Sequence, residues 1–142
     1  MVTPKLLALS FVAAALATNP MLVTAQRVMQ TDNSTVYING GIGEEEADAM
    51  RRIAAEFALR IVVADGPRNE FTAKIPVTIS DTRGNSVLAL PEAGPLLYVM
   101  LPEGRYTVSA ESDGIRKSQQ VTVGRGRGAD VVFHWNTPSN AY

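Results

Sequence analysis

The sequence predicts a mainly β protein, a seven-stranded antiparallel β-sandwich preceded by one N-terminal helix. Three observations support this fold class. From residue 58 onward, apolar and polar residues alternate in about seven short runs. Turn-forming residues separate these runs at spacings of roughly ten residues, which is typical of a sandwich. The only stretch with a helical period comes before the first run, and no alternation of strands and helices indicates a parallel sheet.

Composition limits the classes of function. The chain has 142 residues, of which 46% are hydrophobic and 19% are charged, and this balance favours one globular domain. A net charge of −1 gives no electrostatic reason to expect nucleic-acid binding. The sequence has no Cys and one His, so disulfides, thiol catalysis and a His-rich metal site are not expected. We therefore predict no cofactor and no metal.

Residues 1–25 have the pattern of a cleavable signal peptide. Lys5 gives a positive start, residues 6–17 are a continuous apolar run, and Val23 and Ala25 are small residues at a cleavage position after Ala25. The run is shorter than the roughly 20 apolar residues of a membrane span. The alternative is an uncleaved N-terminal anchor. The prediction is a periplasmic or secreted protein of a bacterial envelope, with no membrane span after cleavage.

The next segment is expected to lead into the helix. Residues 26–43 are interpreted as a flexible arm and a glycine turn, although residues 36–38 could form a short extended segment. A helix is predicted over residues 44–57, because apolar residues recur there at steps of three and four. Three glutamates begin this helix. They could bind a cation, but the helix dipole explains them as a solvated helix start.

Residues 58–136 contain the predicted sandwich, and residues 137–142 form a C-terminal tail. Pro76 implies that its strand lies at an edge or contains a bulge. The run at residues 96–101 is apolar on both faces, so one face is expected in the core and the other against the helix or a partner. The predicted strands are 59–63, 75–80, 86–90, 96–101, 105–111, 119–123 and 129–135.

Two sequence elements resemble carboxypeptidase regulatory-like domains. Residues 75–84 resemble the V-x-I-x-D-x-x-G opening of that family, and residues 101–108 resemble its L-P-x-G-x-Y-x-V turn and strand. The resemblance implies a transthyretin-like sandwich that serves as a folding, docking or ligand-binding accessory. The residues that carry this signature are Asp81, Gly84, Leu101, Pro102, Gly104, Tyr106 and Val108. We expect a positive φ at Gly84 and at Gly104, and a buried Tyr106 ring whose hydroxyl bonds to the backbone.

The catalytic motifs of enzymes related to this family are missing from the sequence. A metallocarboxypeptidase site needs a His-x-x-Glu pair, but Thr137 stands three residues after His134. The C-terminus, residues 139–142, also lacks the Tyr-Arg-Gly-Ser ending of the transthyretin-like 5-hydroxyisourate hydrolases. His134 is expected to point away from the core on the last strand.

Residues 124–128 are the one compact basic feature. Arg125 and Arg127 could contact an anion or a partner through two guanidinium groups, or they could form a solvated hairpin tip. The favoured function is a non-enzymatic binding, docking or scaffold module with an envelope protein as partner. The alternatives are a structural subunit joined by strand addition and a hydrolase that uses carboxylates and Arg.

Overall fold

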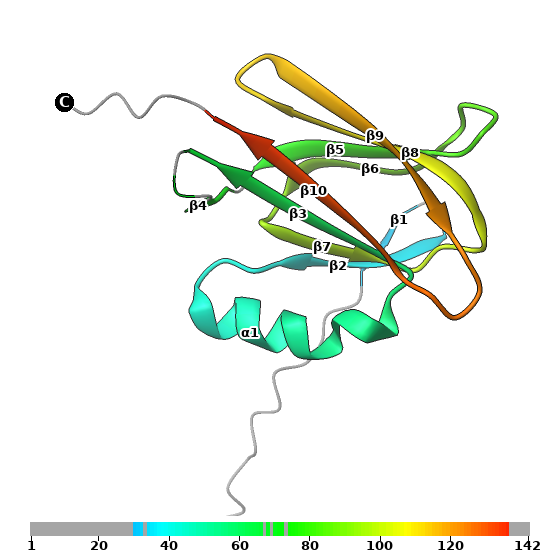
Figure 1. The fold of residues 1–142 in the computed structure, drawn as a ribbon, viewed down its shortest axis with the longest axis horizontal. Helices are drawn as coiled ribbons and strands as arrows, with labels where there is room; N and C mark the ends of the chain where they lie inside the picture. The colour runs from blue at the N-terminus through cyan, green and yellow to red at the C-terminus, as the bar shows by residue number, and fades with distance from the viewer. Residues whose placement is uncertain (1–29, 33, 67, 69, 73, 137–142) are drawn as a thin grey trace, which may run out of the picture.

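The chain forms two stacked β-sheets with one helix against the larger sheet (Figure 1). The computed structural model describes residues 30–32, 34–66, 68, 70–72 and 74–136. The predicted signal peptide and C-terminal tail lie outside the described residues. Among the described residues, no helix has the length and apolar character needed to cross a membrane.

The larger sheet has the strand order β1-β2-β7-β3-β10, and the short strand β4 pairs with β3. All its pairings are antiparallel except that of β3 with β10, which is parallel. Its strands are β1 (Gln30–Asp32), β2 (Thr35–Gly40), β3 (Leu59–Asp65), β4 (Glu70–Phe71), β7 (Leu96–Val99) and β10 (Ala129–Trp135).

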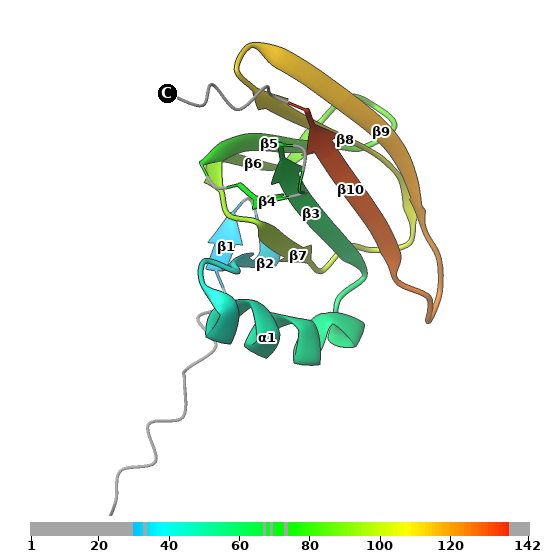
Figure 2. The same ribbon diagram turned by 60° about the vertical axis from the view of Figure 1, so that its left-hand side comes forward.

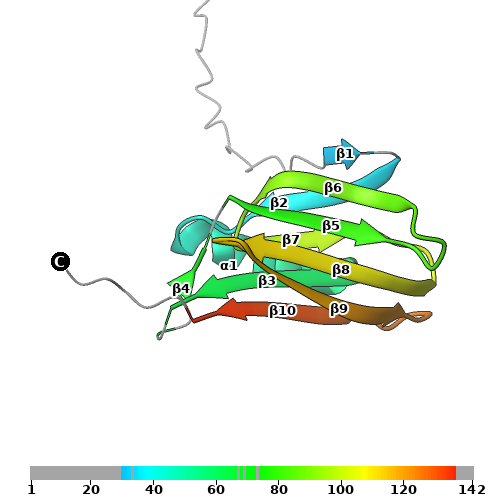
Figure 3. The same cartoon turned by 90° about the horizontal axis from the view of Figure 1, so that it is seen from above.

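The smaller sheet has the order β6-β5-β8-β9 and is antiparallel throughout. Figure 3 shows it in front of the larger sheet. Pro76 lies in β5 between two paired strands, where the register with β6 shifts between Ile75 and Val77, so the predicted bulge is confirmed. The strands are β5 (Ile75–Ser80), β6 (Ser86–Ala93), β8 (Gly104–Ser112) and β9 (Ile115–Val123).

The predicted strand count and arm need correction. The described residues form ten strands rather than seven, and one of the pairings is parallel. Within the predicted arm, β2 is an inner strand: Tyr37 faces the core and Ile38 faces the helix. The sequence around β2 is too short and polar to show this, because its pairing with β7 joins segments almost 60 residues apart in the chain.

The helix is α1 (Glu44–Ile53), and a 3₁₀ turn over Ala54–Glu56 extends it. Figure 2 shows it along the outer side of β2 and β7. Leu96 and Tyr98 pack under it, which confirms that the helix covers the second face of the apolar run. The strand ends at Val99, and Met100 is 39% exposed. The small cluster under the helix comprises Ile38, Ala47, Met50, Ile53, Phe57, Leu96 and Tyr98.

The main core lies between the two sheets. Alternate residues of each strand point into it, as the period-two pattern predicts. Val131, Phe133 and Trp135 of β10 are buried there, and the rings of Phe133 and Trp135 stack with centroids 5.9 Å apart. The two sheets therefore form a sandwich with one outer face under a helix, and no described element covers the other outer face.

Candidate functional site

The outer face of the smaller sheet carries short polar side chains in register across its strands. We call this surface the polar face. The strand register places Ser86, Ser80, Thr107 and Gln120 in one row, and Ala89, Thr78, Ser109 and Ser118 in the next. Within the second row, the hydroxyls of Ser109 and Ser118 lie 2.8 Å apart in a hydrogen bond. Seven of these eight side chains can donate and accept hydrogen bonds.

An open hollow of about 870 Å³ lies over β8 and β9 on the polar face. Arg105 and Arg116 line it, and neither guanidinium has an ion-pair or hydrogen-bond partner among the described residues. Arg105 is paired with Thr122 and Arg116 with Glu111, so the two positions are six residue steps apart along β8. At about 3.3 Å per residue, the two arginines stand roughly 20 Å apart. One small anion cannot contact both, but an elongated ligand can.

The turn between β5 and β6 closes one end of the hollow. The Asp81 carboxylate accepts hydrogen bonds from the backbone N–H groups of Arg83 and Asn85, both at 2.9 Å. Gly84 has a φ of 82°, so the expected positive φ is confirmed. The Asp81 carboxylate keeps its negative charge in this turn, so the lining of the hollow carries two guanidinium groups and one carboxylate.

The L-P-x-G-x-Y-x-V element supports this face from below. Tyr106 is 8% exposed, and its hydroxyl donates to the carbonyl oxygen of Pro102 at 2.7 Å, as expected. Burial, followed by the nearby Asp81 charge, raises the pKa of the Tyr106 hydroxyl. Val108 is fully buried in the core, and Leu101 packs against the core from a half-buried position.

Gly104 has the positive φ that the sequence predicts. Its φ is 157°, and it is the first residue of β8, paired with Val123. The predicted tight reversal between two strands is not formed, because residues 100–103 carry the chain from β7 of the larger sheet to β8 of the smaller sheet. A Cβ at Gly104 would have room, since it would lie 3.6 Å from the Tyr106 ring, but a residue other than glycine would be strained at this φ.

Arg125 and Arg127 lie outside the hollow, in the connection between β9 and β10. The Arg125 side chain is 94% exposed, and its Nε lies 3.5 Å from Oε1 of Glu103. Gly124 and Arg127 form an isolated bridge that closes the tip. The structure does not bring this arginine pair together with Arg105 and Arg116 as lining of one hollow.

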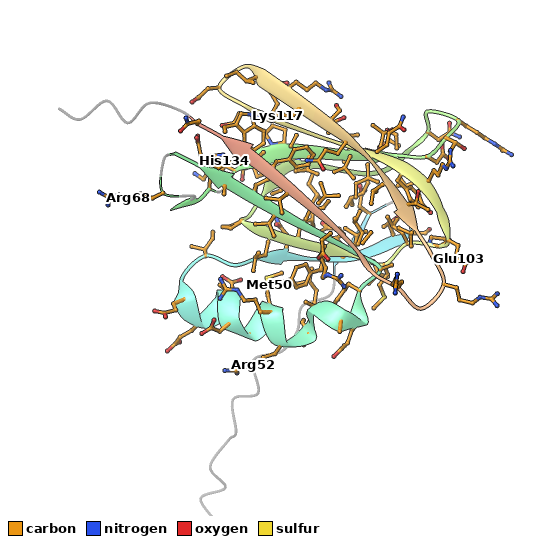
Figure 4. All side chains as sticks on the ribbon, viewed as in Figure 1. Met50, Arg52, Arg68, Glu103, Lys117 and His134 are labelled. Carbon is orange, nitrogen blue, oxygen red and sulfur yellow. The ribbon has the colours of Figure 1, made fainter. Side chains whose placement is uncertain are left out.

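His134 lies on the outer face of β10, opposite in direction to the buried Phe133 and Trp135. Its Nε2 lies 2.9 Å from the carbonyl oxygen of Gly66 in a hydrogen bond. Its own carbonyl oxygen accepts a hydrogen bond from the Lys117 ammonium of β9, and both side chains are labelled in Figure 4. This histidine therefore joins a loop and a strand rather than facing the hollow.

The acidic helix start has structural partners. Glu46 accepts a hydrogen bond from the backbone N–H of Ile42 at 3.1 Å, and Asp48 pairs with Arg51 at 2.6 Å. Within the described ranges, no three His, Cys, Asp or Glu side chains gather in a group that could hold a metal ion.

Comparison with models of known protein families and with curated proteins gives no match for this chain. The polar face itself was not singled out in the sequence. The sequence does contain a pattern that corresponds to it, because polar residues stand at alternate positions of two strands. These residues are Thr107 and Ser109 in one strand and Ser118 and Gln120 in the other. That alternation alone is typical of any solvated sheet face, and only the register shows that the side chains form continuous rows.

Proposed function

We propose that this chain is a non-enzymatic binding or docking module exported to the bacterial envelope, with a carboxypeptidase regulatory-like, transthyretin-like fold. Three features support the proposal: the signal-like residues 1–25, the two sequence elements around Asp81 and Tyr106, and a sandwich architecture that agrees with them. We expect the mature protein to begin at Gln26 in the periplasm or outside the cell.

The observation that carries the proposal is the difference between the two outer faces of the sandwich. Helix α1 covers the outer face of the larger sheet over β2 and β7. The polar face of the smaller sheet has no such cover among the described residues, and it is hollowed. Since ligand sites are concave and combine several polar groups, this face is the surface best suited to binding.

The chemistry of the hollow indicates the class of ligand. Hydroxyl and amide groups lie between two arginines, so the hollow offers neutral hydrogen bonding along its length and a guanidinium group toward each end, with the Asp81 carboxylate also in its lining. The best fit is an elongated, hydrogen-bonding ligand with anionic groups, such as an acidic polysaccharide or an acidic extended segment of an envelope protein.

The test is titration of the mature protein with acidic and neutral oligosaccharides and with acidic peptides, followed by calorimetry. We expect binding by an acidic member of this panel, and at least a threefold loss of affinity in Arg105→Ala and in Arg116→Ala. Arg125→Ala is the matched control, because it removes an exposed arginine outside the hollow. Equal affinity in all four proteins would refute the assignment of the polar face. Turnover of a bound compound would instead favour the hydrolase alternative.

The second candidate function is a structural subunit joined by strand addition. The observation that favours it is the long edge strand β9, whose residues 115–120 are all exposed. An edge of this length can pair with another strand.

A further inference from the structure

The edge strands of the smaller sheet are β6 and β9, and β10 is an edge strand of the larger sheet. Side chains of neighbouring strands bond to the backbone of β6. On β6, the Thr35 hydroxyl donates to the carbonyl oxygen of Val87 at 2.7 Å. The Asp32 carboxylate accepts from the N–H of Ala89 at 3.3 Å, and Asn39 donates to a third β6 residue at 3.1 Å. The backbone of β6 is therefore bonded to side chains of β1 and β2, which leaves fewer groups for a new strand.

The edge of β10 is occupied in the same way from the opposite side of the sandwich. Gln119 of β9 donates its side-chain N–H to the carbonyl oxygen of Val132 at 2.8 Å, and Lys117 donates to that of His134. The ammonium of Lys117 also lies 5.8 Å from the centroid of the Trp135 ring. Two outward carbonyl groups of β10 thus already have donors, and both donors come from β9.

Strand β9 differs: the Trp135 indole N–H donates to the carbonyl oxygen of Ile115 at 2.9 Å, but no described side chain bonds to the backbone groups of β9 that point away from β8. The loop between β8 and β9 is Asp113-Gly114 with φ values of 48° and 77°, which defines a two-residue hairpin with both central residues left-handed. In such a hairpin the flanking pair, Ser112 and Ile115, is hydrogen-bonded, and every second pair after it is hydrogen-bonded as well.

This alternation shows which backbone groups of β9 are not used in pairing with β8. The N–H and C=O groups of Arg116, Ser118, Gln120 and Thr122 point away from β8. All four residues are exposed, and no described side chain bonds to these backbone groups. The register with β8 runs through nine consecutive pairs without a bulge, so this edge is straight enough to accept a strand.

We propose that a second copy of this chain pairs with β9 in the antiparallel direction, about a twofold axis at Gln119, so that two smaller sheets join into one. The sequence of β9 supports this occupant because, paired with its own reverse, it places an apolar residue opposite an apolar one at the strand ends and opposes no two like charges. In this register Ile115 faces Val123 of the second copy, and Ser118 faces Gln120 of the second copy. Ile115 is 56% exposed in the single chain, and the pairing would cover it with an apolar neighbour.

The charges of β9 agree with the same register. Arg116 would face Thr122 of the second copy, and Lys117 would face Val121, so no two like charges are directly opposed. The two Lys117 residues would stand four positions apart along the strands, or about 13 Å, beyond the screening length of about 8 Å at physiological salt. Pairing would also place the two hollows side by side on one continuous sheet.

The test measures the molar mass of the mature protein over a concentration series by sedimentation equilibrium. We expect a monomer–dimer equilibrium for the wild type. Ser118→Pro removes an outward N–H that β8 does not use, so it should give a monomer at every concentration. Ser118→Ala is the matched control: it removes the same hydroxyl but keeps the N–H, and it should dimerise like the wild type.

A second pair of variants tests the register and covers the case in which Ser118→Pro does not fold. Thr122→Glu places a carboxylate opposite Arg116 in both halves of the dimer and should tighten it about three- to tenfold. Thr122→Arg should weaken it by a similar factor. A monomeric wild type would overturn the proposal. So would a folded Ser118→Pro protein that still dimerises, or Thr122 variants that change the dimer constant in the same direction.

Discussion

Truncation of Tyr106 tests the packing on which the polar face rests. The ring is 8% exposed and lies in the core cluster between the sheets, while its hydroxyl donates to Pro102 at 2.7 Å. Tyr106→Ala removes the whole ring and leaves a cavity, which costs about 3–5 kcal/mol for a buried aromatic side chain. Tyr106→Phe keeps the ring and loses only the hydrogen bond, which is worth about 0.5–1.5 kcal/mol.

The assay is urea unfolding of the mature protein followed by fluorescence. Trp135 is the only tryptophan of the chain and is 2% exposed, so its emission reports on the core. The midpoint should fall slightly for Tyr106→Phe and strongly for Tyr106→Ala, with an unchanged slope. A loss below about 1 kcal/mol for Tyr106→Ala would refute the packing argument. Equal losses in the two variants would show that the hydroxyl, rather than the ring, holds this segment.

Three further predictions use the same unfolding assay. Asn39→Ala should cost about 1–3 kcal/mol, because the side-chain Oδ1 of Asn39 accepts from the half-buried N–H of Gly94 at 2.6 Å and the variant leaves that donor unpaired. Asp130→Asn should cost up to about 1 kcal/mol at neutral pH, since Asp130 pairs with Arg60 at 2.6 Å but is 68% exposed. The hydrogen bond from Arg60 lowers the pKa of Asp130 below its usual 3.8. The stability that the ion pair contributes is therefore present above pH 3.8 and disappears as the pH falls through the lowered pKa. A stability difference between the wild type and Asp130→Asn that persists in strong acid would contradict this. Arg125→Ala should change the free energy of unfolding by less than about 0.5 kcal/mol, and a larger loss would mean that the tip is structural.

The close approach of the chain at Gly94 to the backbone at Gly40 explains why a glycine stands at position 94. A Cβ on Gly94 would lie 2.7 Å from the backbone oxygen of Gly40, so only glycine fits where the chain bends from β6 into β7. In the sequence this residue simply lies between the predicted strands 86–90 and 96–101. Its role depends on β2, which lies more than 50 residues earlier in the chain.

Local patterns in the sequence were sufficient for much of the fold. The stripe of apolar residues predicts helix α1, and alternation predicts β3, β5, β8 and β10, because burial of one face imposes a period on each element. Residue types with special backbone or hydrogen-bonding properties predict the turn at Gly84, the bulge at Pro76 and the bonded hydroxyl of Tyr106.

Only the tertiary structure decided which strands are neighbours. The inner position of β2, the parallel pairing of β3 with β10, and the rows of hydroxyls on the polar face all join segments far apart in the chain. Arg105 and Arg116 became candidate ligand contacts because register brings their strands to one hollow, while the more conspicuous Arg125 and Arg127 remain at an exposed tip. The physical reason is that a side-chain pattern records which face of an element is buried, whereas the choice of partner strand depends on packing energies summed over the whole molecule.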